Sequence, residues 1–168
     1  MVLYIYFNYQ DRVSQTAIRV LRSLLKQLIS QQGSASSSML KLYEDCTSRD
    51  IPPDLYILLQ EFKSGCGEFD TVYVLMDAFD ECDGVQQGPI ISLVREVLLL
   101  PSVKVMITTR PYLPNLPTLS QSGLELEIKA WDEDVRAFLA FRLEGVRYIS
   151  EDLKRKAIDA IAQGAEGM

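Results

Sequence analysis

The 168-residue chain contains no histidine. This absence excludes Ser-His-Asp and Cys-His catalysis, and it excludes metalloprotease sites built on the H-E-x-x-H pattern. It also removes the commonest ligand of transition metals. The chemistry open to the chain is therefore that of carboxylates, lysine, arginine, hydroxyl groups and a hard metal ion.

Cysteine, basic runs and long apolar runs are also scarce. The three cysteines are widely spaced and form no C-x-x-C pair, so we expect reduced thiols and a cytoplasmic location. The net charge is −6 and no cluster of lysine or arginine stands out, which argues against a nucleic-acid partner. No apolar run approaches the roughly 20 residues that span a bilayer, so no membrane partner is expected.

What the sequence does contain is an alternation of strand and helix patterns. We predict strands at 2–9, 71–76, 103–109 and 124–130, and helices at 15–30, 38–46, 54–65, 89–100, 132–145 and 150–163. Ser14, Asp54, Asp132 and Ser150 are the expected N-caps, and Gly33 is an expected helix stop. A Pro-rich loop is expected at 111–117. This order predicts an α/β fold with a largely parallel sheet flanked by helices.

The strands at 71–76 and 103–109 are apolar at nearly every position, which is typical of central strands buried on both faces. The first is followed by Asp77, Asp80 and Glu81, and the second ends in Thr108, Thr109 and Arg110. Ligands of open α/β sheets lie outside the carboxyl ends of the strands. If the two strands are neighbours, these side chains line one pocket.

Three carboxylates so close together repel one another unless a positive group lies among them. Mg²⁺ bound to a nucleotide phosphate meets that need, and Asp77 is best placed to hold it. Asp80 or Glu81 then orients or deprotonates an attacking water, while Thr109 and Arg110 contact the nucleotide. Two plainer readings stay open: an aspartate after a strand is common in turns, and Arg110 could simply pair with Asp77 or Asp80.

At these residues the chain resembles a NACHT-type nucleoside triphosphatase of the signal-transducing STAND class, in the version found in fungal ankyrin-repeat or other repeat-bearing receptors. "VLMDAFDEC" resembles the extended Walker B motif, and "VMITTRP" resembles the sensor 1 strand. "LEIKAWDEDVRAFLAFRL" resembles the passage into the helical region that follows. The resemblance implies a P-loop NTPase-like sheet, Mg²⁺ with ATP or GTP, and switch-like self-assembly or binding to protein partners. It divides the chain into a partial core, 1–130, and the start of a helical region, 131–168.

The sequence departs from this family in one respect: G-x-x-x-x-G-K-[ST] is absent, and no Gly-Lys pair occurs. That loop supplies the backbone N–H groups and the lysine that hold phosphates. In the family it precedes the point where this chain starts, so we expect Met1 to begin inside the domain, without its first strand. A compact core of the strands 2–9, 71–76 and 103–109 is expected. The strand 124–130 either closes the gap or leaves an edge open.

Three functions remain as hypotheses at this point. The first is a fragment of a NACHT-type nucleotide switch that binds nucleotide poorly alone and is inactive as an NTPase. The second is a non-catalytic protein-interaction scaffold whose acidic residues are relics. The third is a phosphoryl enzyme that binds Mg²⁺ directly through Asp77, Asp80 and Glu81.

Overall fold

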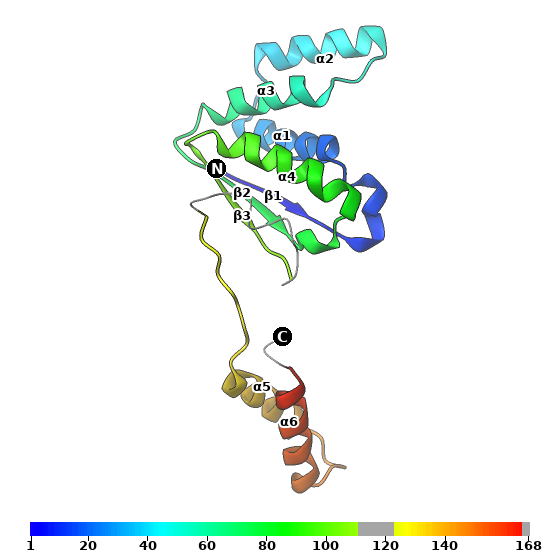
Figure 1. The fold of residues 1–168 in the computed structure, drawn as a ribbon, viewed down its shortest axis with the longest axis vertical. Coiled ribbons are helices and arrows are strands. Elements are labelled where there is room, and N and C mark those ends of the chain that lie inside the picture. The colour runs from blue at the N-terminus through cyan, green and yellow to red at the C-terminus, as the bar shows by residue number, and fades with distance from the viewer. Residues whose placement is uncertain (111–122, 166–168) are drawn as a thin grey trace. The chain divides into compact units, whose positions relative to one another are not determined.

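The computed structural model describes residues 1–110 and 123–165, and the expected Pro-rich loop at 111–117 lies outside them. In this part of the chain the structure is α/β, with six α-helices and three strands (Figure 1). The strands are β1 (Val2–Tyr6), β2 (Val72–Asp77) and β3 (Val103–Ile107). The helices are α1 (Ala17–Gln32), α2 (Ser37–Arg49), α3 (Leu55–Cys66), α4 (Gly84–Leu98), α5 (Asp132–Glu144) and α6 (Glu151–Ala165).

The three strands form one parallel sheet in the order β1-β2-β3, which confirms the predicted three-strand core. The register pairs Tyr4 with Leu75, and Leu75 in turn pairs with Met106 on β3. Because the strands are parallel, their carboxyl ends lie along the same edge of the sheet.

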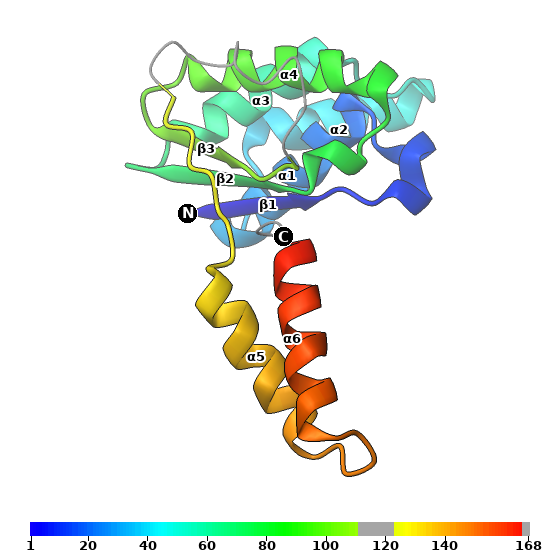
Figure 2. The same cartoon turned by 60° about the horizontal axis from the view of Figure 1, so that its bottom comes forward.

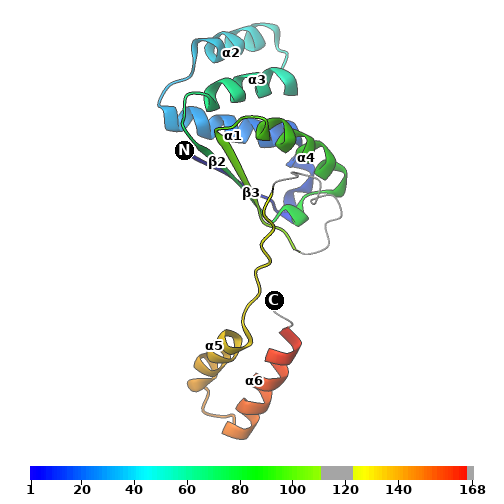
Figure 3. The same ribbon diagram turned by 60° about the vertical axis from the view of Figure 1, so that its left-hand side comes forward.

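Helices α1, α3 and α4 all lie on one face of the sheet, as Figures 2 and 3 show. The strand order explains this arrangement. Both crossovers step in the same direction across the sheet, and right-handed crossovers in one direction place their helices on the same side. Helix α2 lies farther from the sheet and has no buried residue.

The hydrophobic core lies between this helical layer and the sheet. On the sheet side it contains Leu3, Val72, Val74, Met76 and Val103, all at most 3 % exposed. The helices contribute the following buried side chains: Val20, Leu21, Leu24 and Leu28 from α1, Leu58 and Phe62 from α3, and Ile90, Leu93 and Val94 from α4. β2 therefore buries alternate residues, with a period of two, and β1 and β3 follow the same alternation with only Leu3 and Val103 fully buried.

The other face of the sheet is exposed within the described residues, which corrects the prediction that the central strands are buried on both faces. We call it the open face, and it consists of Val2, Tyr4, Tyr6, Tyr73, Leu75, Lys104 and Met106. Tyr4 is 49 % exposed and Met106 is 55 % exposed. The prediction failed because apolar residues indicate that a surface is unfavourable in water. They do not indicate which element, if any, covers that surface.

The outer edge of β1 is covered by side chains of α1. Gln27 Oε1 accepts a hydrogen bond from the Tyr4 amide at 3.0 Å, and its Nε2 donates to the Tyr4 carbonyl at 2.7 Å. Gln31 Nε2 donates to the Val2 carbonyl at 2.8 Å. These bonds occupy three of the backbone groups that another strand would need in order to pair with β1.

Most helix boundaries follow the expected capping chemistry. Asp54 caps α3 by accepting from the Ile57 amide at 2.8 Å, and Gly33 ends α1 in the left-handed region at φ 78°. Two expected N-caps are wrong. Thr16, not Ser14, caps α1, and α5 begins at Asp132 itself, with no side-chain cap at the preceding residue.

Residues 124–130 form no strand, which corrects the prediction of a fourth one. Leu124, Leu126 and Ile128 are each at least 79 % exposed, and no described strand forms hydrogen bonds with this segment. An alternating pattern is not sufficient for a strand, because a strand also needs a neighbour for its amide groups.

The chain separates into two units, Met1–Gly123 and Leu124–Met168. The predicted functional division into 1–130 and 131–168 stays a prediction. In the second unit α5 and α6 pack together as a hairpin, and Arg136 on α5 forms ion pairs with Asp132 and with Asp159 on α6. Across the described residues, no helix combines the length and the apolar character that a membrane span requires.

Candidate functional site

The candidate site lies at the carboxyl edge of the sheet, where β2 runs into the segment 77–81, which we call the acidic turn. Asp77 is the last residue of β2, and Phe79–Glu81 form a single 3-10 turn. Phe79 is 1 % exposed and packs edge-on against Phe7, with ring centroids 5.3 Å apart. This buried aromatic contact anchors the turn to the end of β1.

Ala78 has φ 55° and ψ 46°, the left-handed conformation that residues with a Cβ adopt at a cost of about 1–2 kcal/mol. Thr108, just after β3, holds this conformation in place. Its Oγ1 accepts a hydrogen bond from the Ala78 amide at 3.0 Å, and its carbonyl accepts from the Phe79 amide at 3.0 Å. The strained backbone therefore depends on the neighbouring strand for its hydrogen bonds.

The same Thr108 hydroxyl donates a hydrogen bond to Asp77 Oδ1. One hydroxyl thus fixes both the carboxylate and the backbone turn that follows it. Thr109, which the sequence analysis assigned to nucleotide binding, makes a different contact: its hydroxyl donates to the Arg110 carbonyl at 3.2 Å. The pattern "ITT" could not decide between the two threonines, since only the register with β2 distinguishes them.

The three carboxylates of the acidic turn contact three different partners. Asp80 pairs with Arg110, since Oδ2 lies 3.4 Å from Arg110 Nε and Oδ1 accepts from the Arg110 amide at 3.2 Å. Glu81 Oε2 accepts from the Tyr9 amide at 3.1 Å, at the start of the 3-10 segment Tyr9–Ser14 that follows β1. The repulsion expected among the acids is therefore relieved by divergence and by one arginine.

The structure thus brings Asp77, Asp80, Glu81 and Arg110 to one edge, but in separate pairs. Among the described residues, no group of three or more acidic or cysteine side chains could hold a metal ion together. This arrangement does not favour the hypothesis of a direct three-carboxylate metal cluster. Sequence reasoning missed the Tyr9 contact, because a backbone amide leaves no signal in a residue pattern.

Cys82 follows the acidic turn and is 4 % exposed. Burial is the main cause that raises the pKa of its thiol to about 11, and the negative charge of Asp83 adds to the shift. The thiol is therefore protonated at neutral pH, which makes it a poor nucleophile.

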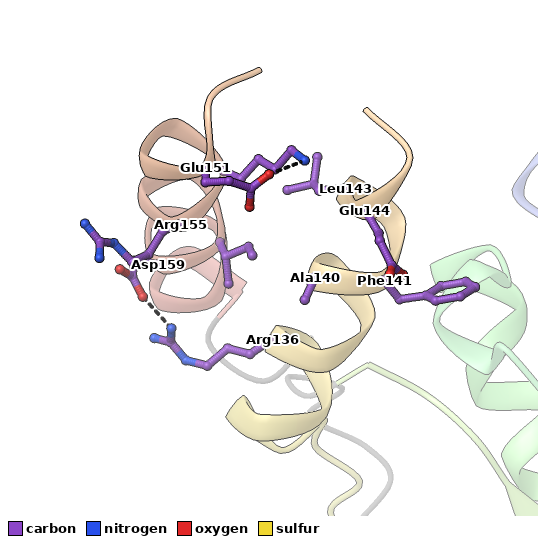
Figure 4. Close-up of a pocket in the computed structure, with 10 residues that line it drawn as sticks. Arg136, Ala140, Phe141, Leu143, Glu144, Glu151, Arg155 and Asp159 are labelled. Atoms are coloured by element: carbon purple, nitrogen blue, oxygen red, sulfur yellow. Dashed lines mark hydrogen bonds and ion pairs between the residues drawn. The ribbon is translucent and has the colours of Figure 1, made fainter. Parts of the chain in front are cut away.

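Two hollows in the described chain are lined by other residues. One of about 580 Å³ opens between α5 and α6, where Arg136 reaches toward Asp159 (Figure 4). Another of about 520 Å³ lies between α1 and α3, beside Glu61 and Phe69. Both are broad surface hollows, and neither includes a residue of the acidic turn.

The fold and the edge together define an α/β protein with a parallel sheet and a polar, acid-bearing carboxyl edge. The family described as nephrocystin 3, N-terminal matches residues 1–110. The chain belongs to this family, and the match includes all three strands, the acidic turn and Arg110. No curated protein and no solved structure matches the chain.

Proposed function

We propose that residues 1–110 carry the magnesium and sensor half of a NACHT-type nucleotide switch, which uses Mg²⁺ with ATP or GTP. The observation that carries the proposal is the hydrogen bond from Thr108 to Asp77 across two neighbouring parallel strands. It joins the last residue of β2 to the tail of β3 at the place where open α/β sheets bind ligands. The Walker B-like and sensor 1-like sequences are joined by this contact.

The residues present fit a magnesium ion that is shared with phosphate. Thr108 engages one oxygen of Asp77, and the exposed carboxylate has a second oxygen for a ligand. Mg²⁺ usually takes one or two carboxylates and completes its shell with waters and phosphate oxygens. When bound, the ion neutralises phosphate charge, and the role of Thr108 is to hold Asp77 in one orientation.

Arg110 is the cation of this edge that we assign to phosphate. Its side chain is 81 % exposed, whereas that of Asp80 is 19 % exposed. A guanidinium pairs well with phosphate oxygens, and the exposed guanidinium of Arg110 is open to such a ligand. If Arg110 turns to a phosphate, Asp80 keeps its hydrogen bond from the Arg110 amide and has its other oxygen to orient water. Glu81 is the second candidate for that role, after release from the Tyr9 amide.

We expect the 168 residues to bind nucleotide poorly, because they contain no Gly-Lys pair and hence no phosphate loop. The test is calorimetric titration of ATP–Mg²⁺ and GTP–Mg²⁺ into this chain and into a version joined to an upstream strand, phosphate loop and helix. The extended version should bind, and Asp77→Ala should abolish its magnesium dependence. Asp45→Ala, at an exposed acid on α2, is the matched control.

Two results would count against the proposal. Tight binding by the 168 residues would show that the phosphate loop is dispensable. Magnesium dependence that survives Asp77→Ala in the extended version would remove Asp77 from the site.

The alternative function is a protein-interaction scaffold, and the open face is the observation that favours it. A scaffold and a switch differ in their response to Asp77→Ala in a longer protein that contains this chain. A switch loses nucleotide-dependent assembly, whereas a scaffold assembles as before.

A further inference from the structure

The open face is a regular grid of side chains set by the register of the sheet. One row holds Val2, Tyr73 and Lys104, and the next holds Tyr4, Leu75 and Met106. The third row begins with Tyr6 and Asp77. The rings of Tyr4 and Tyr6 lie 5.5 Å apart, so the tyrosines form a continuous surface along β1.

This surface is apolar in the middle and charged at its two ends. Lys104 lies in the row nearest the amino ends of the strands, and Asp77 lies at the carboxyl end, beside the remaining acids of the turn. Tyr73 is 50 % exposed and Leu75 is 36 % exposed, although they belong to the central strand. Parallel sheets are normally covered on both faces, so exposure of a central strand is unfavourable.

The size of the open face decides between two kinds of occupant. Three strands about 4.8 Å apart and five residues long give a surface of roughly 15 by 16 Å. A stable dimer buries about 800 Å² of accessible surface per partner, contributed by roughly 20–30 residues, whereas the open face consists of seven. A single α-helix is about 10 Å wide and covers 16 Å with about 11 residues, so its footprint matches.

The charges fix the direction of such a helix. The N-terminus of a helix carries a partial positive charge and its C-terminus a partial negative charge. A helix antiparallel to the strands places its N-terminus near Asp77 and its C-terminus near Lys104, so both ends are matched. The reverse direction places like charges together at both ends.

We infer that the open face docks one amphipathic α-helix of a partner, about three turns long and antiparallel to the strands. Its apolar stripe covers Tyr4, Leu75 and Met106, and basic residues in its first turn face Asp77. Asp77 is also the magnesium ligand of the proposed switch, so the docking is measured without magnesium and nucleotide, and its failure leaves the proposed switch untouched.

The test uses the full chain and two synthetic peptides of about 12 residues, with leucines at the i, i+3, i+4, i+7 spacing. One peptide has lysines in its first turn and glutamates in its last, and the second has these charges exchanged. Both are held helical by an i,i+4 side-chain lactam bridge, because the first pattern opposes the helix dipole. Fluorescence anisotropy measures binding, and amide chemical shifts locate it. We expect the lysine-first peptide to bind and to shift the signals of Tyr4, Leu75 and Met106, with the exchanged peptide several-fold weaker.

Leu75→Lys should weaken binding by about tenfold or more, because it places a charge in the apolar centre. Tyr4→Lys, on the edge strand, is a second variant in case Leu75→Lys disturbs folding, which circular dichroism reports. The matched control is Leu40→Lys, at a residue of α2 that is 54 % exposed and outside the open face. It should leave binding unchanged.

Four outcomes would overturn the inference. Neither peptide binds, or binding persists in both sheet variants, or shifts map to the helical layer instead. A concentration-dependent dimer that Leu75→Lys dissociates would also overturn it, because the occupant would then be a second copy of the chain.

Discussion

Thr108→Val is the sharpest test of how the candidate site is built. The substitution keeps the shape of the side chain and removes a hydroxyl that makes two hydrogen bonds, one to the Asp77 carboxylate and one from the Ala78 amide. A bond to a charged group contributes about 1.5–3 kcal/mol, and a stranded amide costs about 1–3 kcal/mol. Because the edge is partly exposed, we expect a net loss of about 2 kcal/mol in the free energy of unfolding.

The matched control is Thr109→Val, next in the chain. The Thr109 hydroxyl contacts only the Arg110 carbonyl among the described residues, and the residue is exposed, so the change should stay within about 0.5 kcal/mol. Urea unfolding followed by circular dichroism measures both variants. Equal stability of the two variants would refute the reasoning, since it would mean that the Thr108 hydroxyl does not support the turn.

Other substitutions test the packing and the backbone. Gly65→Ala should lower the free energy of unfolding by about 1 kcal/mol, because the new Cβ would lie 2.5 Å from Leu28 Cδ2, and a stabilised variant would contradict this packing. Ala78→Gly should raise it by about 0.5 kcal/mol, since glycine adopts the left-handed conformation without strain; a loss would mean that the strain is not there. Burial raises the pKa of Cys66 and of Cys82 from 9.0 to about 11. The contribution of the two protonated thiols to the free energy of unfolding is therefore complete below about pH 9 and is lost as the pH rises to about 11. Urea midpoints measured from pH 8 to pH 11 should therefore fall more steeply for the native chain than for a variant with alanine at both cysteines, and parallel profiles would argue against the effect.

The sequence predicted the parts of the fold that depend on local pattern. The alternation of strands and helices predicted the parallel sheet. Asp54 and Gly33 marked the start of α3 and the end of α1, because capping depends on the local residue type. The start of α4 was placed too late, at Pro89 rather than Gly84. Pro89 suggested the first turn of this helix. The residue that caps the helix is Asp83, whose Oδ1 accepts a hydrogen bond from the Val85 amide at 2.9 Å.

The parts that could not be predicted depend on contacts between distant segments. The sequence left open whether Arg110 pairs with Asp77 or with Asp80, and the choice of Asp80 follows from the path of the turn after Ala78. The segment 124–130 has the alternation of a strand, yet a pattern carries no information on whether a partner strand is present. The open face was missed for the same reason.

The glutamines of α1 have a consequence for how copies of this chain can meet edge to edge. Gln27 and Gln31 occupy three outward groups of β1, the amide and carbonyl of Tyr4 and the carbonyl of Val2, whereas in the described residues the outward N–H and C=O groups of Val105 and Ile107 on β3 have no such partner. The edge of β1 is therefore partly protected against pairing with a further strand. Two copies that joined through β3 would have only these partly protected edges at their outer sides, which disfavours further lateral addition.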